Sequence, residues 1–171
     1  MKIASLDLGT NSLILVVAEW DGTTLTPLFE DVQVVRLGQG LAKRGSLHPK
    51  AKRRCLKELR NFSEKIDQFE VKNVLAAGTA ALRNAGDGAK FVQEIEDQLG
   101  FRFKIISGDE EASLTFKAIQ REFSDLAQQF IMIDIGGGSS ELVVGDGDRI
   151  LSKTSLEVGT VSFTERFIQH D

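Results

Sequence analysis

Two segments of this chain share one unusual pattern, and that pattern limits the folds open to it. The segment ASLDLGTNSLILVV reads as an apolar strand that ends in Asp7, a loop of small residues and a second strand. The segment IMIDIGGGSSELVV repeats this order around Asp134. Aligning the two aspartates also aligns Gly9 with Gly136. A repeat of this kind indicates two related units rather than one.

Strands and helices are expected to alternate along the remaining sequence. Residues 2–36 read as a meander of three antiparallel strands, with Pro27 at an edge or a bulge because proline cannot donate to a sheet. The apolar periodicity then predicts helices at 48–69, 88–100 and 109–123, and strands at 71–79 and 101–107. After Phe123 the strand–loop–strand pattern returns, followed by a third strand and the start of a helix.

This order predicts an α/β fold with two units, residues 1–125 and residues 126–171. The second unit has three strands and one helix start, so we expect it to be incomplete. Three strands bury one face only against helices or another sheet. We therefore expect residues 128–171 either to pack on a neighbouring chain, giving a homodimer, or to dock on the first unit in a non-native way. The 171-residue chain alone is expected to be nearly inactive.

Composition excludes several classes of partner and site. The net charge is -4, which gives no broad basic field for double-stranded nucleic acid. One cysteine, Cys55, permits no intrachain disulfide, and one cysteine with two histidines argues against a zinc site. No apolar run approaches the roughly 20 residues that span a bilayer, and the N-terminus does not read as a secretory signal. We therefore expect no membrane association and a cytoplasmic location.

The two loops have the composition of phosphate-binding turns. Small residues leave the backbone N–H groups free to surround an oxyanion. Glycine lets the backbone approach the anion closely and takes positive φ where a turn needs it. Serine and threonine add hydroxyl donors, and the aspartate before each loop supplies a hard oxygen for Mg²⁺. A ligand-free glycine hairpin is the alternative for one such loop, but two of them favour phosphate.

Five motifs, in order, resemble one known family. They are DLGTNS at 7–12, GTAALRNA at 78–85, SGDEEA at 107–112, DIGGGSSE at 134–141 and VGTVSFTERF at 158–167. The chain resembles the exopolyphosphatase and guanosine pentaphosphate phosphohydrolase (Ppx/GppA) family of the actin-like ATPase superfamily. The resemblance implies a ribonuclease-H-like domain, built of a mixed five-stranded sheet with helices, and the start of a second, similar domain. It also implies a cytoplasmic bacterial enzyme.

Four positions depart from the family pattern. Thr10 and Ser140 exchange one hydroxyl residue for another, so the donor is kept. Asp87 stands where asparagine is usual. Ser162 stands where arginine is common, which removes a possible phosphate contact and leaves the substrate preference open.

The resemblance assigns two roles to side chains outside the loops. It places the family's water-activating glutamate at Glu111, and hydrolysis of a phosphoanhydride does need a carboxylate base. The alternative is an acid that the helix dipole favours, which is the interpretation we give Glu110. Arg83 is the expected phosphate clamp, because guanidinium contacts phosphate oxygens at two points. The alternative for Arg83 is a surface arginine.

The loops supply the remaining candidate residues. Those expected to bind phosphate are Thr10, Asn11, Ser12, Gly137, Gly138 and Ser139. Mg²⁺ is the expected cofactor, with Asp134 and Glu141 as candidate ligands and Asp7 as a further one. Glu141 could equally have a capping or structural role.

The leading functional hypothesis is a phosphohydrolase. The resemblance implies that it removes a terminal phosphate from inorganic polyphosphate or guanosine pentaphosphate by metal-assisted attack of water. The alternatives are an actin-like nucleotide-binding module, either a kinase or a non-hydrolytic sensor, and an inactive relative that binds without turnover. The sequence leaves open the choice among polyphosphate, guanosine pentaphosphate and nucleotide, the preferred chain length and the oligomeric state.

Overall fold

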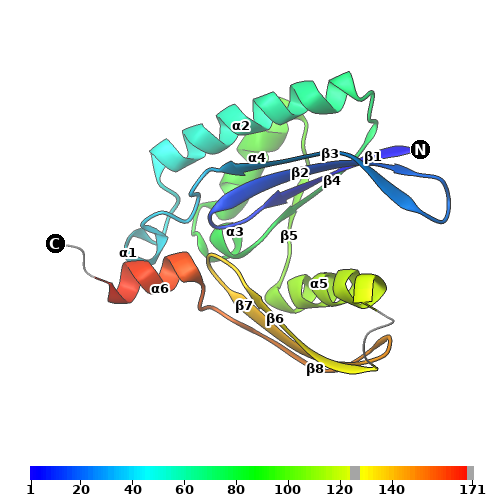
Figure 1. Ribbon diagram of the computed structural model, residues 1–171. Helices are drawn as coiled ribbons and strands as arrows, with labels where there is room; N and C mark the ends of the chain where they lie inside the picture. Colours follow the sequence, from blue (N-terminus) through cyan, green and yellow to red (C-terminus); the bar gives the residue numbers. More distant parts are fainter. Residues whose placement is uncertain (124–127, 169–171) are drawn as a thin grey trace.

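The chain forms two sheets that lie on opposite sides of a gap (Figure 1). The computed structural model describes residues 1–123 and 128–168. The first sheet has five strands in the order β3-β2-β1-β4-β5. Its strands are β1 (Lys2–Leu8), β2 (Ser12–Trp20), β3 (Leu25–Val34), β4 (Asn73–Gly78) and β5 (Phe103–Ile105). β1, β2 and β3 pair antiparallel, whereas β4 is parallel to β1 and β5, so the sheet is mixed as the sequence predicted.

Four helices belong to the first sheet. They are α1 (Leu41–Arg44), α2 (Pro49–Gln68), α3 (Ala80–Asn84) and α4 (Gly88–Leu99). The long helix α2 begins at a histidine cap, where His48 Nδ1 accepts from the N–H of Lys50, and Pro49 occupies the first helical position. Sequence periodicity did not predict α1 or α3, because helices of four and five residues are too short to show one.

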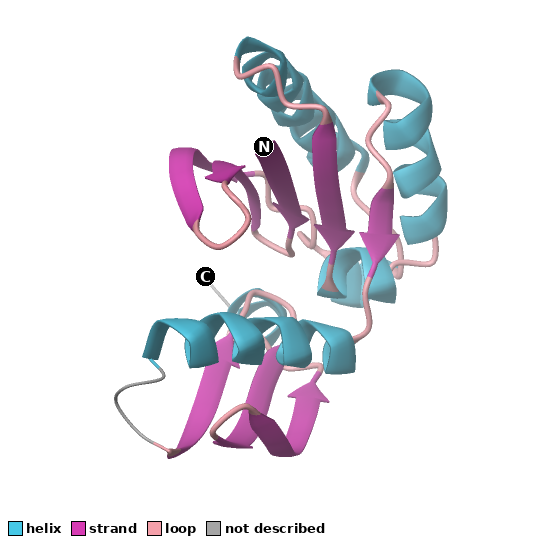
Figure 2. Ribbon diagram, turned by 90° about the vertical axis from the view of Figure 1, so that its right-hand side faces the viewer, coloured by secondary structure: helices cyan, strands magenta, loops and turns pink. Residues whose placement is uncertain are grey.

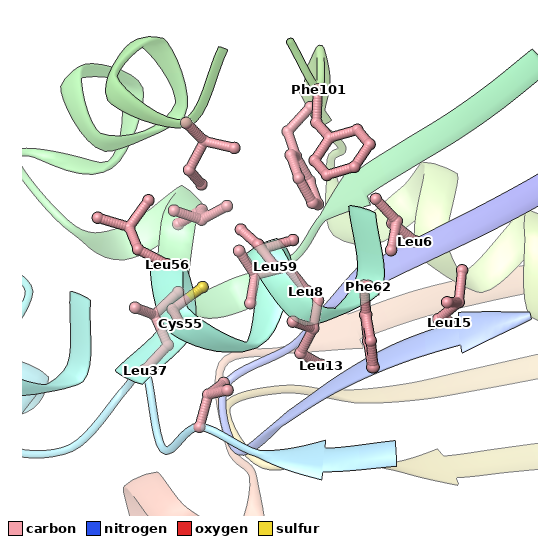
Figure 3. Close-up of a cluster of buried hydrophobic side chains, with 14 of the residues drawn as sticks. Leu6, Leu8, Leu13, Leu15, Leu37, Cys55, Leu56, Leu59, Phe62 and Phe101 are labelled. Atoms are coloured by element: carbon pink, nitrogen blue, oxygen red, sulfur yellow. The ribbon is translucent and has the colours of Figure 1, made fainter. Parts of the chain in front are cut away.

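Alternating burial along β1 gives the first sheet two unlike faces. Ala4, Leu6 and Leu8 are buried, whereas Ser5 and Asp7 point to the opposite, open face. The buried face packs on α2 and α4 in one apolar core (Figure 3). This core fixes the sheet so that the end of β1 presents Asp7 toward the second sheet.

Pro27 lies where its missing N–H is harmless. β3 is an edge strand, and its register against β2 shifts between Val17 and Ala18. Pro27 pairs with Ala18, directly beside this bulge. Both parts of the prediction for this residue are confirmed.

The second sheet has three strands and is covered on one face by a helix (Figure 2). Its elements are α5 (Gly108–Phe123), β6 (Gln129–Ile135), β7 (Ser140–Asp146), β8 (Arg149–Leu156) and α6 (Thr160–Phe167). Phe116 of α5 joins Met132 and Val143 in a buried cluster and stacks on Phe130 at a centroid distance of 5.3 Å. α5 therefore shares its core with the second sheet, although the predicted division at residue 126 places it in the first unit.

The other face of the second sheet is apolar and open. Ile131, Ile133 and Ile135 are each more than 60% exposed, at 69%, 61% and 64%. Val143, by contrast, is fully buried because α5 covers its side of the sheet. In residues 1–123 and 128–168, no helix combines the length and the apolar content that crossing a membrane requires.

Candidate active site

The two glycine-containing loops form the same turn. The N–H of Gly9 donates to the carbonyl of Ser12 at 2.9 Å, and the N–H of Gly136 donates to the carbonyl of Ser139 at 3.0 Å. The repeat that aligns these residues in the sequence is thus a structural repeat. Figure 1 shows the β1–β2 and β6–β7 turns facing each other between the sheets.

Both loops leave backbone donors unused by the fold. Within residues 1–123 and 128–168, the N–H groups of Thr10, Asn11, Gly137 and Gly138 donate to no backbone carbonyl. Successive free N–H groups in a turn are suited to an anion. The predicted phosphate residues therefore lie together, four of them on facing loops with free donors.

The glycines of the second loop let the two loops approach each other closely, and they do not adopt positive φ. Positive φ occurs at five other glycines, including those of the turns at Gly22 and Gly147, and at none in this loop. The expectation of positive φ in the loop is therefore wrong. A Cβ on Gly138 would lie 2.9 Å from the Cβ of Ala80 and would overlap the Thr10 hydroxyl. Bare backbone is needed here because the two loops touch.

The first turn of α5 separates two neighbouring glutamates. Ser107 caps the helix, since its Oγ accepts from the N–H of Glu110 at 3.1 Å. The Glu110 carboxylate turns outward to Lys104 Nζ at 2.5 Å. The Glu111 carboxylate turns inward, is 19% exposed, and lies 3.2 Å from Arg83 Nη1. Glu110 lies in the first turn of α5, and its role as an acid that the helix dipole favours stays a prediction.

Arg83 is held by four bonds at the end of α3. Its Nη1 donates to the carbonyl of Ile106 at 3.0 Å and to Glu111 Oε2 at 3.2 Å. Its Nε and Nη2 donate to one oxygen of Glu157 at 3.3 Å and 3.2 Å. The other Glu157 oxygen accepts from the side chain of Asn84. Arg83 is not a free surface arginine, because its side chain is only 18% exposed.

Glu111 has the electrostatics of a general base. Burial and the nearby Glu141 charge raise the pKa of Glu111 to about 7, and the charge of Asp7 adds to the rise. The hydrogen bond and positive charge of Arg83 oppose the rise. A carboxyl with a pKa close to neutral pH is a stronger base than an ordinary carboxylate, and about half of it is still ionised there.

The charge of Asp134, in the second sheet, acts on Asp7 at the end of β1. The Asp7 carboxylate keeps some contact with solvent, yet crowding by protein atoms and the negative charge of Asp134 raise its pKa. In the described parts of the chain, no three His, Cys, Asp or Glu side chains converge as a metal-binding cluster. Mg²⁺ does not need such a cluster, since it commonly uses one or two carboxylates with water and substrate phosphate. The Asp7–Asp134 pair fits that kind of shared site.

Glu141 is buried beside the reactive groups. It pairs with Asp134 across β6 and β7 and is 1% exposed. Its Oε1 accepts from the Ser155 hydroxyl at 2.7 Å. The hydrogen bond from Ser155 gives the buried Glu141 carboxylate a structural contact within the protein. The charge of Glu141 also contributes to the raised pKa of Glu111. Its role as a metal ligand stays a prediction.

The start of α6 holds the glycine loop in place. The N–H groups of Thr160 and Val161 donate to the carbonyls of Gly136 and Gly137, each at 2.9 Å. Ser162 caps the helix through its hydroxyl, which accepts from the N–H of Gly159 at 2.9 Å. The serine that replaces a common arginine also contacts the loop, since its hydroxyl donates to the carbonyl of Gly138 at 3.4 Å.

A cavity of about 320 Å³ adjoins the loops. Thr10 and Gly138 lie on its wall, as do Asn84 and Glu157. Sequence reasoning did not single out Glu157, Asn84 or Ser155. Glu157 precedes the VGTVSFTERF motif by one residue, and no spacing rule connects it to Arg83, which is 74 residues away.

Comparison with known proteins identifies relatives over nearly the whole chain. The model of the Ppx/GppA phosphatase family matches residues 15–171. A guanosine-5'-triphosphate,3'-diphosphate pyrophosphatase of Vibrio cholerae is 35% identical over 95% of this chain and 33% of its own length. A bifunctional 3-dehydroquinate synthase/phosphatase of Fusobacterium nucleatum is 34% identical over 96% of this chain and 26% of its own length.

A solved structure shares the arrangement of both sheets. An exopolyphosphatase of Cytophaga hutchinsonii is 30% identical, with a TM-score of 0.95 over 100% of this chain and 55% of its own. The chain therefore spans a third or less of these curated relatives and about half of this solved structure. The α/β fold is that of the actin-like ATPases, as the motifs implied.

Proposed function

Because this chain belongs to the Ppx/GppA phosphatase family, we propose that it forms part of a hydrolase that removes the terminal phosphate of a polyphosphorylated substrate. The substrate class is inorganic polyphosphate or guanosine pentaphosphate. The observation that carries the proposal is the position of Glu111, whose carboxyl has a pKa of about 7 and contacts Arg83. The names of the relatives support the same chemistry.

The first step is binding of the terminal phosphate beside the two loops. The free N–H groups of Thr10, Asn11, Gly137 and Gly138 donate to its oxygens, and the hydroxyls of Ser12 and Ser139 add donors. Arg83 contributes a charged two-point contact. These donors fix the phosphorus atom for attack and stabilise negative charge as it develops.

The second step is attack by water. The oxygen of the water molecule forms a bond to the terminal phosphorus, and Glu111 accepts a proton from that water molecule. The bond from that phosphorus to the bridging oxygen breaks, and the shortened phosphate chain leaves with the bonding electrons. The raised pKa of Glu111 suits this transfer, since base strength and ionised fraction are balanced near neutral pH.

A divalent cation fits the acidic end of the two strands. Asp7 and Asp134, with water, would hold Mg²⁺ against the phosphate oxygens, and Glu141 is a further candidate. When bound, the ion would neutralise charge on the phosphates. Its second effect would be to relieve the repulsion that now raises the pKa of Asp7.

The test is phosphate release by the full-length protein with Mg²⁺. Polyphosphate, guanosine pentaphosphate and ATP are compared at equal terminal-phosphate concentration, with Glu111→Gln as the control. We expect release from at least one of the first two substrates and almost none from the variant. Binding of ATP without any phosphate release would support the nucleotide-binding alternative and contradict this proposal.

A further inference from the structure

Arg83 already has an anion on the edge that phosphate would use. Nε and Nη2 form the side of a guanidinium that best matches two oxygens of an oxyanion. Both donate to Glu157 Oε1, at 3.3 Å and 3.2 Å. The third nitrogen, Nη1, is turned away to Ile106 and Glu111. A phosphate cannot take the two-point contact while Glu157 holds it.

Glu157 is the movable partner of this pair. Its side chain is 52% exposed, whereas that of Arg83 is 18% exposed. Glu157 follows β8 in the second unit, and Arg83 lies on α3 of the first. The carboxylate also borders the cavity of about 320 Å³, so it has space to turn away. Arg83, by contrast, stays fixed by Ile106 and Glu111 when Glu157 leaves.

We propose that Glu157 is an internal anion that occupies the phosphate-binding edge of Arg83 until a substrate phosphate displaces it. This inference rests on the proposed function, because it takes Arg83 as the phosphate clamp. A ligand that binds this edge of Arg83 must first break the contact between Arg83 and Glu157. This cost lowers the affinity of every such ligand by the same factor. Glu157 therefore keeps the affinity for inorganic phosphate low enough for the product to leave.

The test measures binding of inorganic phosphate to the full-length protein by calorimetry. Glu157→Gln keeps the shape of the side chain and removes its charge. We expect phosphate to bind about two- to five-fold more tightly to this variant, the range expected from one partly exposed ion pair. In turnover assays the inhibition by product phosphate should become stronger by the same factor.

Glu165→Gln is the matched control. The Glu165 carboxylate also joins the two units, accepting from the N–H of Gly40 at 2.8 Å and 3.0 Å, but it does not touch Arg83. We expect phosphate affinity to stay at the wild-type value. In an Arg83→Gln background, Glu157→Gln should lose its effect, because the edge for which the two anions compete is gone.

Several outcomes would overturn the inference. Unchanged or weaker phosphate binding by Glu157→Gln would mean that Glu157 only positions Arg83. Equal tightening by Glu165→Gln would mean that loosening the contact between the units is sufficient. Absence of binding in both wild type and Glu157→Gln would also contradict it. If no substrate is hydrolysed but the variant still binds phosphate more tightly than wild type, the proposed function fails and the role of Glu157 stands.

Discussion

Arg83 Nη1 lies 3.2 Å from Glu111 Oε2, which joins the proposed phosphate clamp to the proposed base. The two residues come from different helices, α3 and α5. Arg83 lowers the pKa of Glu111 against the stronger effects of burial and the Glu141 charge. Removing the charge of Arg83 should therefore alter both phosphate binding and the pH dependence of the reaction.

The pH profile should report the ionisation of Glu111. Its pKa is raised to about 7, and only the ionised carboxylate can accept a proton, so kcat/KM should fall as pH drops below about 7. Glu111→Gln should reduce the rate by about 10²- to 10⁴-fold and remove this acidic limb. Phosphate release from pH 5 to 9 is the measurement. A Gln variant that keeps half the wild-type rate would exclude Glu111 as the base.

Arg83→Lys should weaken substrate binding although the charge is kept. Lysine presents a point charge and cannot make the planar two-point contact. The acidic limb should stay near its wild-type position, because a positive charge still faces Glu111. Arg83→Gln should move that limb to higher pH, since the charge that lowers the pKa of Glu111 is lost. Equal KM for wild type and the Lys variant would place Arg83 outside the binding site.

Glu111 should also make the fold less stable at higher pH. Its pKa is raised from 4.5 in the unfolded reference to about 7 in the folded protein, so folding favours the protonated form. The resulting stability is present below pH 4.5 and is lost as pH rises through 7. The free energy of unfolding of Glu111→Gln should rise relative to that of wild type by at most about 3 kcal/mol from pH 4 to 8. Urea unfolding at both pH values tests this, and an equal difference at both would contradict it.

Asp134→Asn should raise the Mg²⁺ concentration needed for half-maximal phosphate release, by about 10-fold or more. The substitution removes one of two carboxylates that would share the ion. It also removes a repulsion that raises the pKa of Asp7, so the free energy of unfolding should not fall. Asp109→Asn is the control, since that exposed side chain pairs only loosely with Lys153 at 3.8 Å. An identical Mg²⁺ requirement in both variants would exclude Asp134 as a ligand.

Gly138→Ala should disturb the contact between the loops more than Gly137→Ala. The added methyl at 138 would overlap the Thr10 hydroxyl and crowd Ala80 at 2.9 Å, whereas the nearest atom to one at 137 is 3.2 Å away. Overpacking of this kind costs about 1 to 3 kcal/mol. Thermal unfolding and KM for the two alanine variants provide the comparison. The reverse order would show that the loops do not need this close approach.

The sequence alone determined the repeated hairpin and the main strands and helices, whereas the mixed sheet was implied by the family resemblance. The segments around Gly9 and Gly136 have the same local pattern, and each forms one hydrogen-bonded turn. These features follow from periods of two and 3.6 residues.

Tertiary structure decided what these patterns touch. The packing of α5 on the second sheet is decided by the contacts of Phe116 with Met132 and Val143, which lie far from it in the sequence. Glu157 reaches Arg83 across 74 residues of sequence, a distance no periodicity encodes. The loop glycines were expected to adopt positive φ, but the structure uses their missing side chains to bring the loops together. Contacts between units depend on packing in three dimensions, whereas strands, helices and turns depend on neighbours along the chain.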